Sequence, residues 1–118
     1  INMCNNDFKN YFKFPLVFKE EFPYVLTNDG KMALTWCIDL PKEKAEEAIN
    51  KMNGYSDKHF DKEWSIKNNI FIYYGDTKVF VVRGWGMLTG IGGYKLKESD
   101  AILIQDSFAK HIVNTLNS

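Results

Sequence analysis

The sequence predicts a two-layer α+β fold, an antiparallel sheet of about four to five strands with two helices packed on one side of it. Two observations indicate this class. Short segments rich in β-branched and aromatic residues are bounded by turn residues, and two longer segments repeat their apolar residues at helical spacing. The expected order of elements is β-β-β-α-β-β-α.

The first three strands are expected before residue 39. Short runs of β-forming residues at 16–18 and 24–27 each follow a proline, which favours sheet edges or strand starts because proline donates no ladder hydrogen bond. Asn-Asp-Gly at 28–30 is typical of a tight turn. Large apolar residues then alternate along 32–38, so we expect a hairpin over residues 23–38.

The first helix is expected over residues 41–53. Pro41 suits a first helical turn, where its missing N–H is not needed, and Asn53-Gly54 suits the end of the helix. A narrow apolar stripe would pack on the sheet: Ala45, Ala48, Ile49 and Met52. The lysines and glutamates of this helix are expected to form a solvated face.

The second hairpin is expected at 64–82. Residues 64–66 and 70–74 are interpreted as one strand, Gly75-Asp76 as a turn, and residues 79–82 as the returning strand. Both faces of this hairpin are apolar or aromatic, which predicts a central position. The other face of the sheet would be solvated, covered by the N-terminal segment, or used for a partner.

The last helix is expected from residue 99 to about residue 116, with Ser99 or Asp100 at its N-terminus, where a short oxygen-bearing side chain accepts from free backbone N–H groups. One face is apolar, namely Ala101, Ile104, Phe108, Ile112 and Leu116. Gln105 falls in the middle of that face.

Length and composition predict one domain, residues 1–118, because two cores of this size would each be marginal. Residues 1–13 are expected to be a loosely attached segment that forms a short helical stretch or drapes over the core. Two isolated cysteines indicate free thiols, and no apolar run has the length of a membrane span. A cytoplasmic location is therefore expected.

The charges of the chain cancel. There are 15 basic and 15 acidic residues, and the lysines are scattered along the sequence. Binding of nucleic acid by broad electrostatic attraction needs a basic face, so this balance argues against it and leaves open only a local basic groove.

The least usual segment is 83–93, which reads RGWGMLTGIGG and contains five of the eight glycines. It opens with Arg83, the only arginine, whose planar guanidinium suits two-pronged binding of a carboxylate, an amide or a phosphate. In a functional interpretation the backbone approaches an anionic or planar ligand. The candidate binding residues are then Arg83, Gly84, Trp85, Gly86, Thr89, Gly90, Gly92 and Gly93.

The structural interpretation of the same segment is the commoner one, in which the glycines supply turns with positive φ and Arg83 forms a structural ion pair. A glutamine side chain on a buried face needs hydrogen-bond partners. The nearest free backbone donors and acceptors in the sequence are those of the glycine segment. We therefore hypothesise that Gln105 clamps this segment to the last helix and that Asp106 pairs with Arg83. Neither a P-loop nor a dinucleotide fingerprint is present.

The string R-G-W-G-x-L-T-G-x-G-G, followed by I-Q-D-x-F at 104–108, resembles a group of small uncharacterised proteins of bacteriophages and other mobile elements of bacteria. The likeness extends upstream through residues 14–16 and the 32–38 strand. The resemblance implies no known activity. It favours a small accessory protein that acts on a host or defence component over a metabolic enzyme.

Catalytic and metal-binding sets are not predicted. His59 and His111 have no second ligand at metal-binding spacing, and Cys37 lies mid-strand among apolar neighbours. Several aromatic residues could stack on single-stranded bases at an open sheet face. Aromatic residues are, however, common in strands for reasons of packing, and the sequence shows no cluster of basic residues around them. These aromatic residues are Phe71, Tyr73, Phe80, Trp85 and Tyr94.

We expect a non-enzymatic binding protein, without a cofactor, that holds a protein partner through the glycine segment or the uncovered sheet face. The alternative is a binder of nucleic acid or of a small phosphorylated ligand at Arg83, Trp85 and the neighbouring backbone amides.

Overall fold

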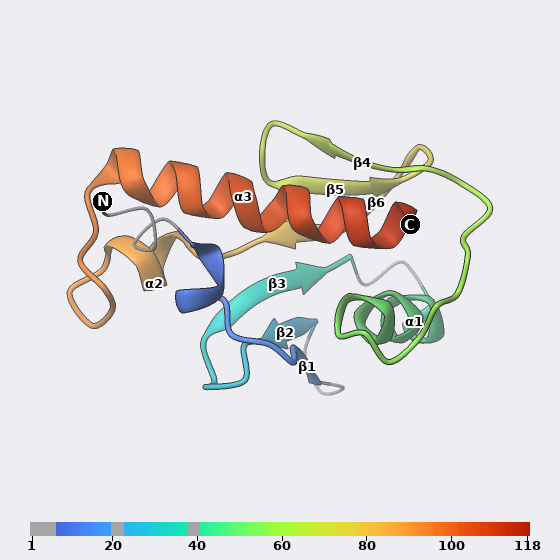
Figure 1. The fold of residues 1–118 in the computed structure, drawn as a ribbon, viewed down its shortest axis with the longest axis horizontal. Coiled ribbons are helices and arrows are strands. Elements are labelled where there is room, and N and C mark those ends of the chain that lie inside the picture. Colours follow the sequence, from blue (N-terminus) through green and yellow to red (C-terminus); the bar gives the residue numbers. More distant parts are fainter. Residues whose placement is uncertain (1–6, 20–22, 38–40) are drawn as a thin grey trace.

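The computed structural model describes residues 7–19, 23–37 and 41–118, so residue 38 of the predicted strand lies outside the described part. The chain forms an α+β fold with one antiparallel sheet, as predicted (Figure 1). The strands are β1 (Val17–Lys19), β2 (Tyr24–Leu26), β3 (Met32–Trp36), β4 (Trp64–Lys67), β5 (Phe71–Tyr74) and β6 (Thr77–Val82). Their order across the sheet is β1-β2-β3-β6-β5-β4.

The sheet has six strands, one more than the upper limit of the prediction, because residues 64–74 form two strands instead of one. Asn68 and Asn69 take positive φ angles of 54° and 66°, which asparagine tolerates better than most residues. The chain therefore reverses between β4 and β5. The predicted hairpin of β2 and β3 is formed.

The helices are η2, a 3-10 helix (Phe8–Asn10), α1 (Lys42–Met52), α2 (Trp85–Thr89) and α3 (Glu98–Asn117). The first long helix lies within one residue of its predicted bounds, and Gly54 follows it with a φ of 79°. The predicted cap of the last helix is wrong. Lys97, and not Ser99 or Asp100, is the N-cap residue, and its side chain makes no capping hydrogen bond.

Residues 7–13 are anchored to the core by Phe12. Phe12 is fully buried and stacks on Phe108 of α3, with ring centroids 3.9 Å apart and planes 6° apart. Phe8 also contacts the ring of Phe108. The segment is therefore held against α3, which differs from the loose attachment that we expected for it; residues 1–6 lie outside the described part.

The two faces of the sheet differ in burial. Side chains that point toward α1 and α3 are fully buried, for example Val25, Leu34, Ile72 and Phe80. Figure 1 shows α3 lying in front of β5 and β6 on this side. Several residues that alternate with them, such as Thr35, remain partly exposed, whereas Ala33 is fully buried. Because η2 packs on α3 and not on the opposite side, neither α1, α3 nor η2 covers the second face.

Candidate functional site

The glycine segment begins with a short helix and is not simply a loop. Gly84 is the N-cap residue of α2, and Gly90 ends the helix by donating its N–H to the carbonyl of Gly86. The Thr89 hydroxyl donates to the carbonyl of Trp85 at 2.8 Å. The hydrogen of the Thr89 hydroxyl is therefore used within the helix, and the binding role of this residue stays a prediction.

The structural interpretation assumed that the glycines of this segment have positive φ angles. They do not. Positive φ angles occur at Gly30, Gly54 and Gly75 instead. Three glycines of the segment are needed because a side chain would collide with what lies beside them. A Cβ atom would lie 2.2 Å from Phe12 Cζ at Gly84, 2.4 Å from Gly86 O at Gly90, and 2.0 Å from Met87 O at Gly93.

The remaining two glycines have open surroundings. A Cβ atom on Gly86 or Gly92 would meet no atom within 4 Å. Backbone hydrogen bonds fix the segment against the core: Tyr94 N donates to Met87 O at 2.9 Å and Leu96 N to Leu88 O at 2.8 Å. The segment is therefore a packed junction between β6 and α3.

A groove of about 690 Å³ opens at this junction. It lies between the end of β6, α2, the first turns of α3 and the turns that precede β3 and β5. Its lining consists of Lys31, Met32, Asn68, Asn69, Ile70, Val82, Arg83, Trp85, Gly86, Met87, Ile102, Gln105 and Asp106. Of the predicted site residues, the groove brings together Arg83, Trp85, Gly86, Gln105 and Asp106. Gly84, Thr89, Gly90, Gly92 and Gly93 do not line it.

Arg83 lies at the rim of the groove with an exposed side chain. Its backbone N–H donates to Ala33 O at 2.8 Å, which fixes its position beside β3. Nε lies 3.5 Å from the Thr35 hydroxyl, a long distance for a hydrogen bond. Among the described residues, no carboxylate lies within ion-pair distance of its guanidinium.

The expected ion pair between Arg83 and Asp106 is not formed. Asp106 pairs with Lys110 at 2.9 Å, one turn further along α3, because residues four apart are neighbours on a helix. Gln105 is 8% exposed, and in the described part of the chain its amide makes no hydrogen bond with the glycine segment. Gln105 instead lines the groove.

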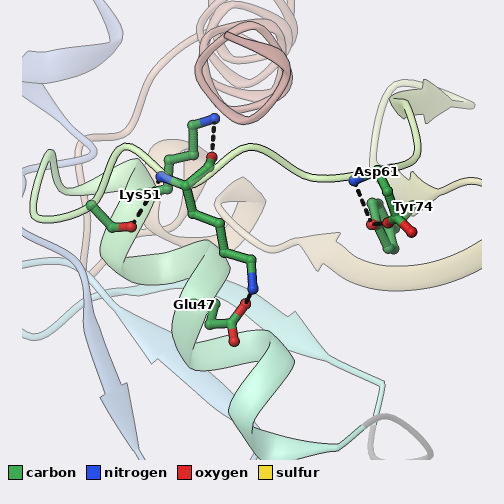
Figure 2. Close-up of polar contacts among 6 residues, drawn as sticks. Glu47, Lys51, Asp61 and Tyr74 are labelled. Carbon is green, nitrogen blue, oxygen red and sulfur yellow. Dashed lines mark hydrogen bonds and ion pairs between the residues drawn. The ribbon is translucent and has the colours of Figure 1, made fainter.

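Lys51 is buried, although the sequence predicts a solvated face for the lysines of α1. It is 4% exposed, and Nζ donates to Lys58 O at 2.6 Å (Figure 2). It also donates to Leu116 O at 3.2 Å and to Ser118 O at 2.6 Å. An ammonium near the carbonyl end of a helix is favourable, so Lys51 joins α1 and a loop to the end of α3. Its position at the edge of the apolar stripe carries no signal of this role.

A second small cavity, of about 290 Å³, lies between α1 and the loop before β4. The Tyr74 hydroxyl donates to the Asp61 carboxylate, which holds the pKa of that carboxyl below its ordinary value (Figure 2). Burial, followed by the same hydrogen bond, raises the pKa of Tyr74. Glu47 of α1 pairs with Lys58, and the aromatic ring of Tyr74 packs on Trp64. These contacts tie the loop to β5.

The histidine and cysteine candidates have structural surroundings. The ring of His111 contacts Phe8 and Phe14, and burial lowers its pKa, with a smaller contribution from the charge of Lys9. Cys37 follows β3, and its backbone N–H donates to Val79 O. Within residues 7–19, 23–37 and 41–118, no group of three or more His, Cys, Asp or Glu side chains is arranged to hold a metal ion.

Comparison with protein-family models, with curated proteins and with solved structures found no match. None of the helices in the described ranges combines the length and the apolar character needed to cross a bilayer. The resemblance to phage and mobile-element proteins therefore stays a prediction, and the groove must be interpreted from its own chemistry.

Proposed function

We propose that the protein is a non-enzymatic binding module that holds a segment of a protein partner in the groove between β6, α2 and α3. The observation that carries this proposal is the composition of the groove. Flexible apolar side chains form its walls, and a guanidinium without a carboxylate partner among the described residues lies at its rim.

The walls have the character of a protein interface. Trp85 is 40% exposed and Ile102 is 50% exposed, and between them the groove is lined by Met32 and Met87. Methionine adapts its shape to a partner, and tryptophan and arginine are enriched where binding energy concentrates. An apolar side chain of the partner would therefore be held between Trp85 and Ile102.

The polar groups would fix the orientation of the partner. Arg83 offers a donor fork for a carboxylate or a backbone carbonyl, and the Gln105 amide offers both a donor and an acceptor deeper in the groove. A few convergent polar groups in a mostly apolar concavity are typical of binding sites. Under the predicted origin, the partner would be a host or defence component.

The groove is tested by site-specific cross-linking. A photo-reactive amino acid in place of Ile102 should capture one partner from a lysate of the source cells, and the same amino acid at exposed Asn114 of α3 should not. Arg83→Gln and Trp85→Ala should each weaken retention of that partner at least about ten-fold, since interface arginines and tryptophans often contribute more than 1 kcal/mol. Equal capture from both positions, or retention unchanged in both variants, would contradict the proposal.

The alternative is a small phosphorylated ligand held by Arg83 and stacked on Trp85. The volume of the groove lies within the range of small-molecule sites. A thermal-shift screen with nucleotides separates the two: a rise in the midpoint that is lost in Arg83→Gln favours the small ligand, and flat responses favour the protein segment.

A further inference from the structure

We infer that the second face of the sheet binds single-stranded nucleic acid, at a site that shares only Arg83 with the groove. We call this surface the open face. Its exposed and partly exposed members are strand residues whose side chains point away from α1 and α3, together with the arginine that follows β6: Val17, Lys19, Tyr24, Thr35, Ser65, Lys67, Phe71, Tyr73, Lys78, Val81 and Arg83. Ala33, on the same side of β3, is fully buried.

Strand pairing arranges six of these residues in one continuous row. Each is the direct partner of the next: Lys19, Tyr24, Thr35, Val81, Phe71 and Lys67, one from each strand. Neighbouring strands lie about 4.8 Å apart, so the row is about 24 Å long. Several nucleotides fit along it, since each takes roughly 3.4 Å or more of a strand.

Among its described residues, the charged side chains of the open face are all cationic, although the whole chain is neutral. No Asp or Glu lies in any of the six strands, whereas Lys19, Lys67 and Lys78 do and Arg83 follows β6. Glu63 and Asp76 precede β4 and β6, at the end of the sheet away from Arg83; Glu20 and Glu21, after β1, lie outside the described residues. Folding therefore gathers scattered lysines into the basic surround that the sequence did not reveal.

Two of the aromatic rings of this face, those of Phe71 and Tyr73, are partly exposed and lie close to lysine ammonium groups. Lys67 Nζ is 4.2 Å from the centroid of the Tyr73 ring, and Lys78 Nζ is 4.8 Å from that of Phe71. An irregularity in the pairing of β5 with β6, between Ile72 and Tyr73, sets Lys78 opposite Tyr73 on this side of the sheet.

These lysine–aromatic contacts can be replaced by contacts with a bound nucleic acid. The ammonium groups would move to phosphates, which attract them more strongly than a ring does, and the vacated ring faces would stack on bases. Stacking on aromatic residues of an open sheet, with cations along the backbone path, is a recognised mode of single-strand binding. A duplex keeps its bases stacked inside and cannot use the rings.

The test is fluorescence anisotropy with labelled twelve-nucleotide oligothymidine and oligouridine, which also distinguishes DNA from RNA. We expect wild-type protein to bind one or both with a dissociation constant below about 100 µM at about 50 mM salt, and to bind more weakly as salt rises. The double variant Lys67→Gln/Lys78→Gln should reduce the slope of log affinity against log salt by about 1.4, since each lysine contributes about 0.7 on a single strand.

The rings are tested separately. Phe71→Leu/Tyr73→Leu should weaken binding about ten-fold or more, with the circular dichroism spectrum unchanged, because leucine fills the space but does not stack. Matched controls are Lys97→Gln/Lys110→Gln on α3 and Tyr55→Leu in the loop after α1, which should bind as wild type. Trp85→Ala changes the groove and should bind the oligonucleotides as wild type does. A failure of the open-face inference can therefore be distinguished from a failure of the proposed function of the groove.

Three results would overturn the inference. One is the absence of any anisotropy change in the wild-type protein at low salt. Another is equal binding of duplex and of single strands that is unaffected by Phe71→Leu/Tyr73→Leu, which would indicate a general polyanion surface. The third is binding that falls as much in the control lysine variant as in Lys67→Gln/Lys78→Gln, since the cations of the open face would then have no special role.

Discussion

The glycine segment depends on the small size of its glycines. Gly84 touches the ring of Phe12, and Gly90 and Gly93 touch backbone carbonyls, so a methyl group at each would overlap an atom of the fold. The ring at Gly84 is itself stacked on Phe108, which leaves it little room to move. This residue therefore joins β6, α2 and the N-terminal segment.

Gly84→Ala should lower the free energy of unfolding by about 2 kcal/mol, because an added methyl group in a packed core forces the neighbouring ring out of place. Urea titration measures this change. Gly92→Ala is the matched control, since it adds the same methyl group where nothing lies within 4 Å, and it should change stability by less than about 0.5 kcal/mol. Equal effects of the two substitutions would show that the contact with Phe12 is unimportant.

The burial of Lys51 could not be predicted from its residue type or its position in the sequence. Its type and its place in a charged helix indicate a solvated side chain, yet its ammonium is buried among three carbonyls from two other parts of the chain. A lysine is rarely buried unless its charge is paired or hydrogen-bonded, and the partners here are known only after α3 has packed beside α1.

At the scale of elements, α3 connects the parts of the molecule. It contacts η2, α1, α2 and β4, and its apolar face is buried as its periodicity predicted. Its N-terminus is less well made. Lys97 has the extended backbone of a cap residue, with φ −62° and ψ 149°, but its side chain cannot accept a hydrogen bond.

Lys97→Asp should raise the free energy of unfolding by about 1 kcal/mol, because a carboxylate at the N-cap accepts from the free N–H groups of the first turn and interacts favourably with the helix dipole. Thermal unfolding by circular dichroism measures the gain. Lys97→Asn provides the cap without the negative charge and should keep most of the gain. If Lys97→Asn has no effect while Lys97→Asp stabilises, charge and not capping is responsible.

At the scale of the whole molecule, the separation of charges matters more than their sum. The described acidic residues lie in α1, α3, loops and turns, and the strands carry only lysine. One side of the sheet is thus buried under helices and the other is basic and aromatic. A neutral chain can therefore present a local surface that attracts a polyanion.

The stability of the whole molecule should also depend on pH through His111. Burial, and then Lys9, lower its pKa below the ordinary value of 6.5, so the unfolded chain binds this proton at a higher pH than the folded chain does. The free energy of unfolding should decrease as pH falls below about 6.5 and be unaffected by this group above it.

Urea titrations at several pH values between about 7.5 and 5.5, on either side of the ordinary histidine pKa, measure this dependence. In His111→Gln the decrease below pH 6.5 should be smaller than in the wild-type protein, because this residue can no longer take up a proton. An identical decrease in both proteins would show that His111 does not contribute.

The fold class, both long helices, the first hairpin and the buried stripe of α3 are predictable from the sequence. These features depend on local periodicity, on turn residues such as Asn28-Asp29-Gly30 and on the Gly54 cap, all of which lie close together in the chain. The sequence also drew attention to Arg83 and Trp85, which the structure places at one groove. The short return at Asn68-Asn69 was missed, because two turn residues inside an aromatic run give a weak signal.

The contacts of these residues depend on the tertiary structure and could not be predicted from the sequence. Asp106 pairs with Lys110 and not Arg83, Gly84 receives the ring of Phe12, and the carbonyls that hold Lys51 come from residues 7 to 67 positions away. The cationic and aromatic row of the open face likewise exists only once six strands pair in register. Contacts between distant residues depend on how elements pack, and local sequence patterns do not encode that arrangement.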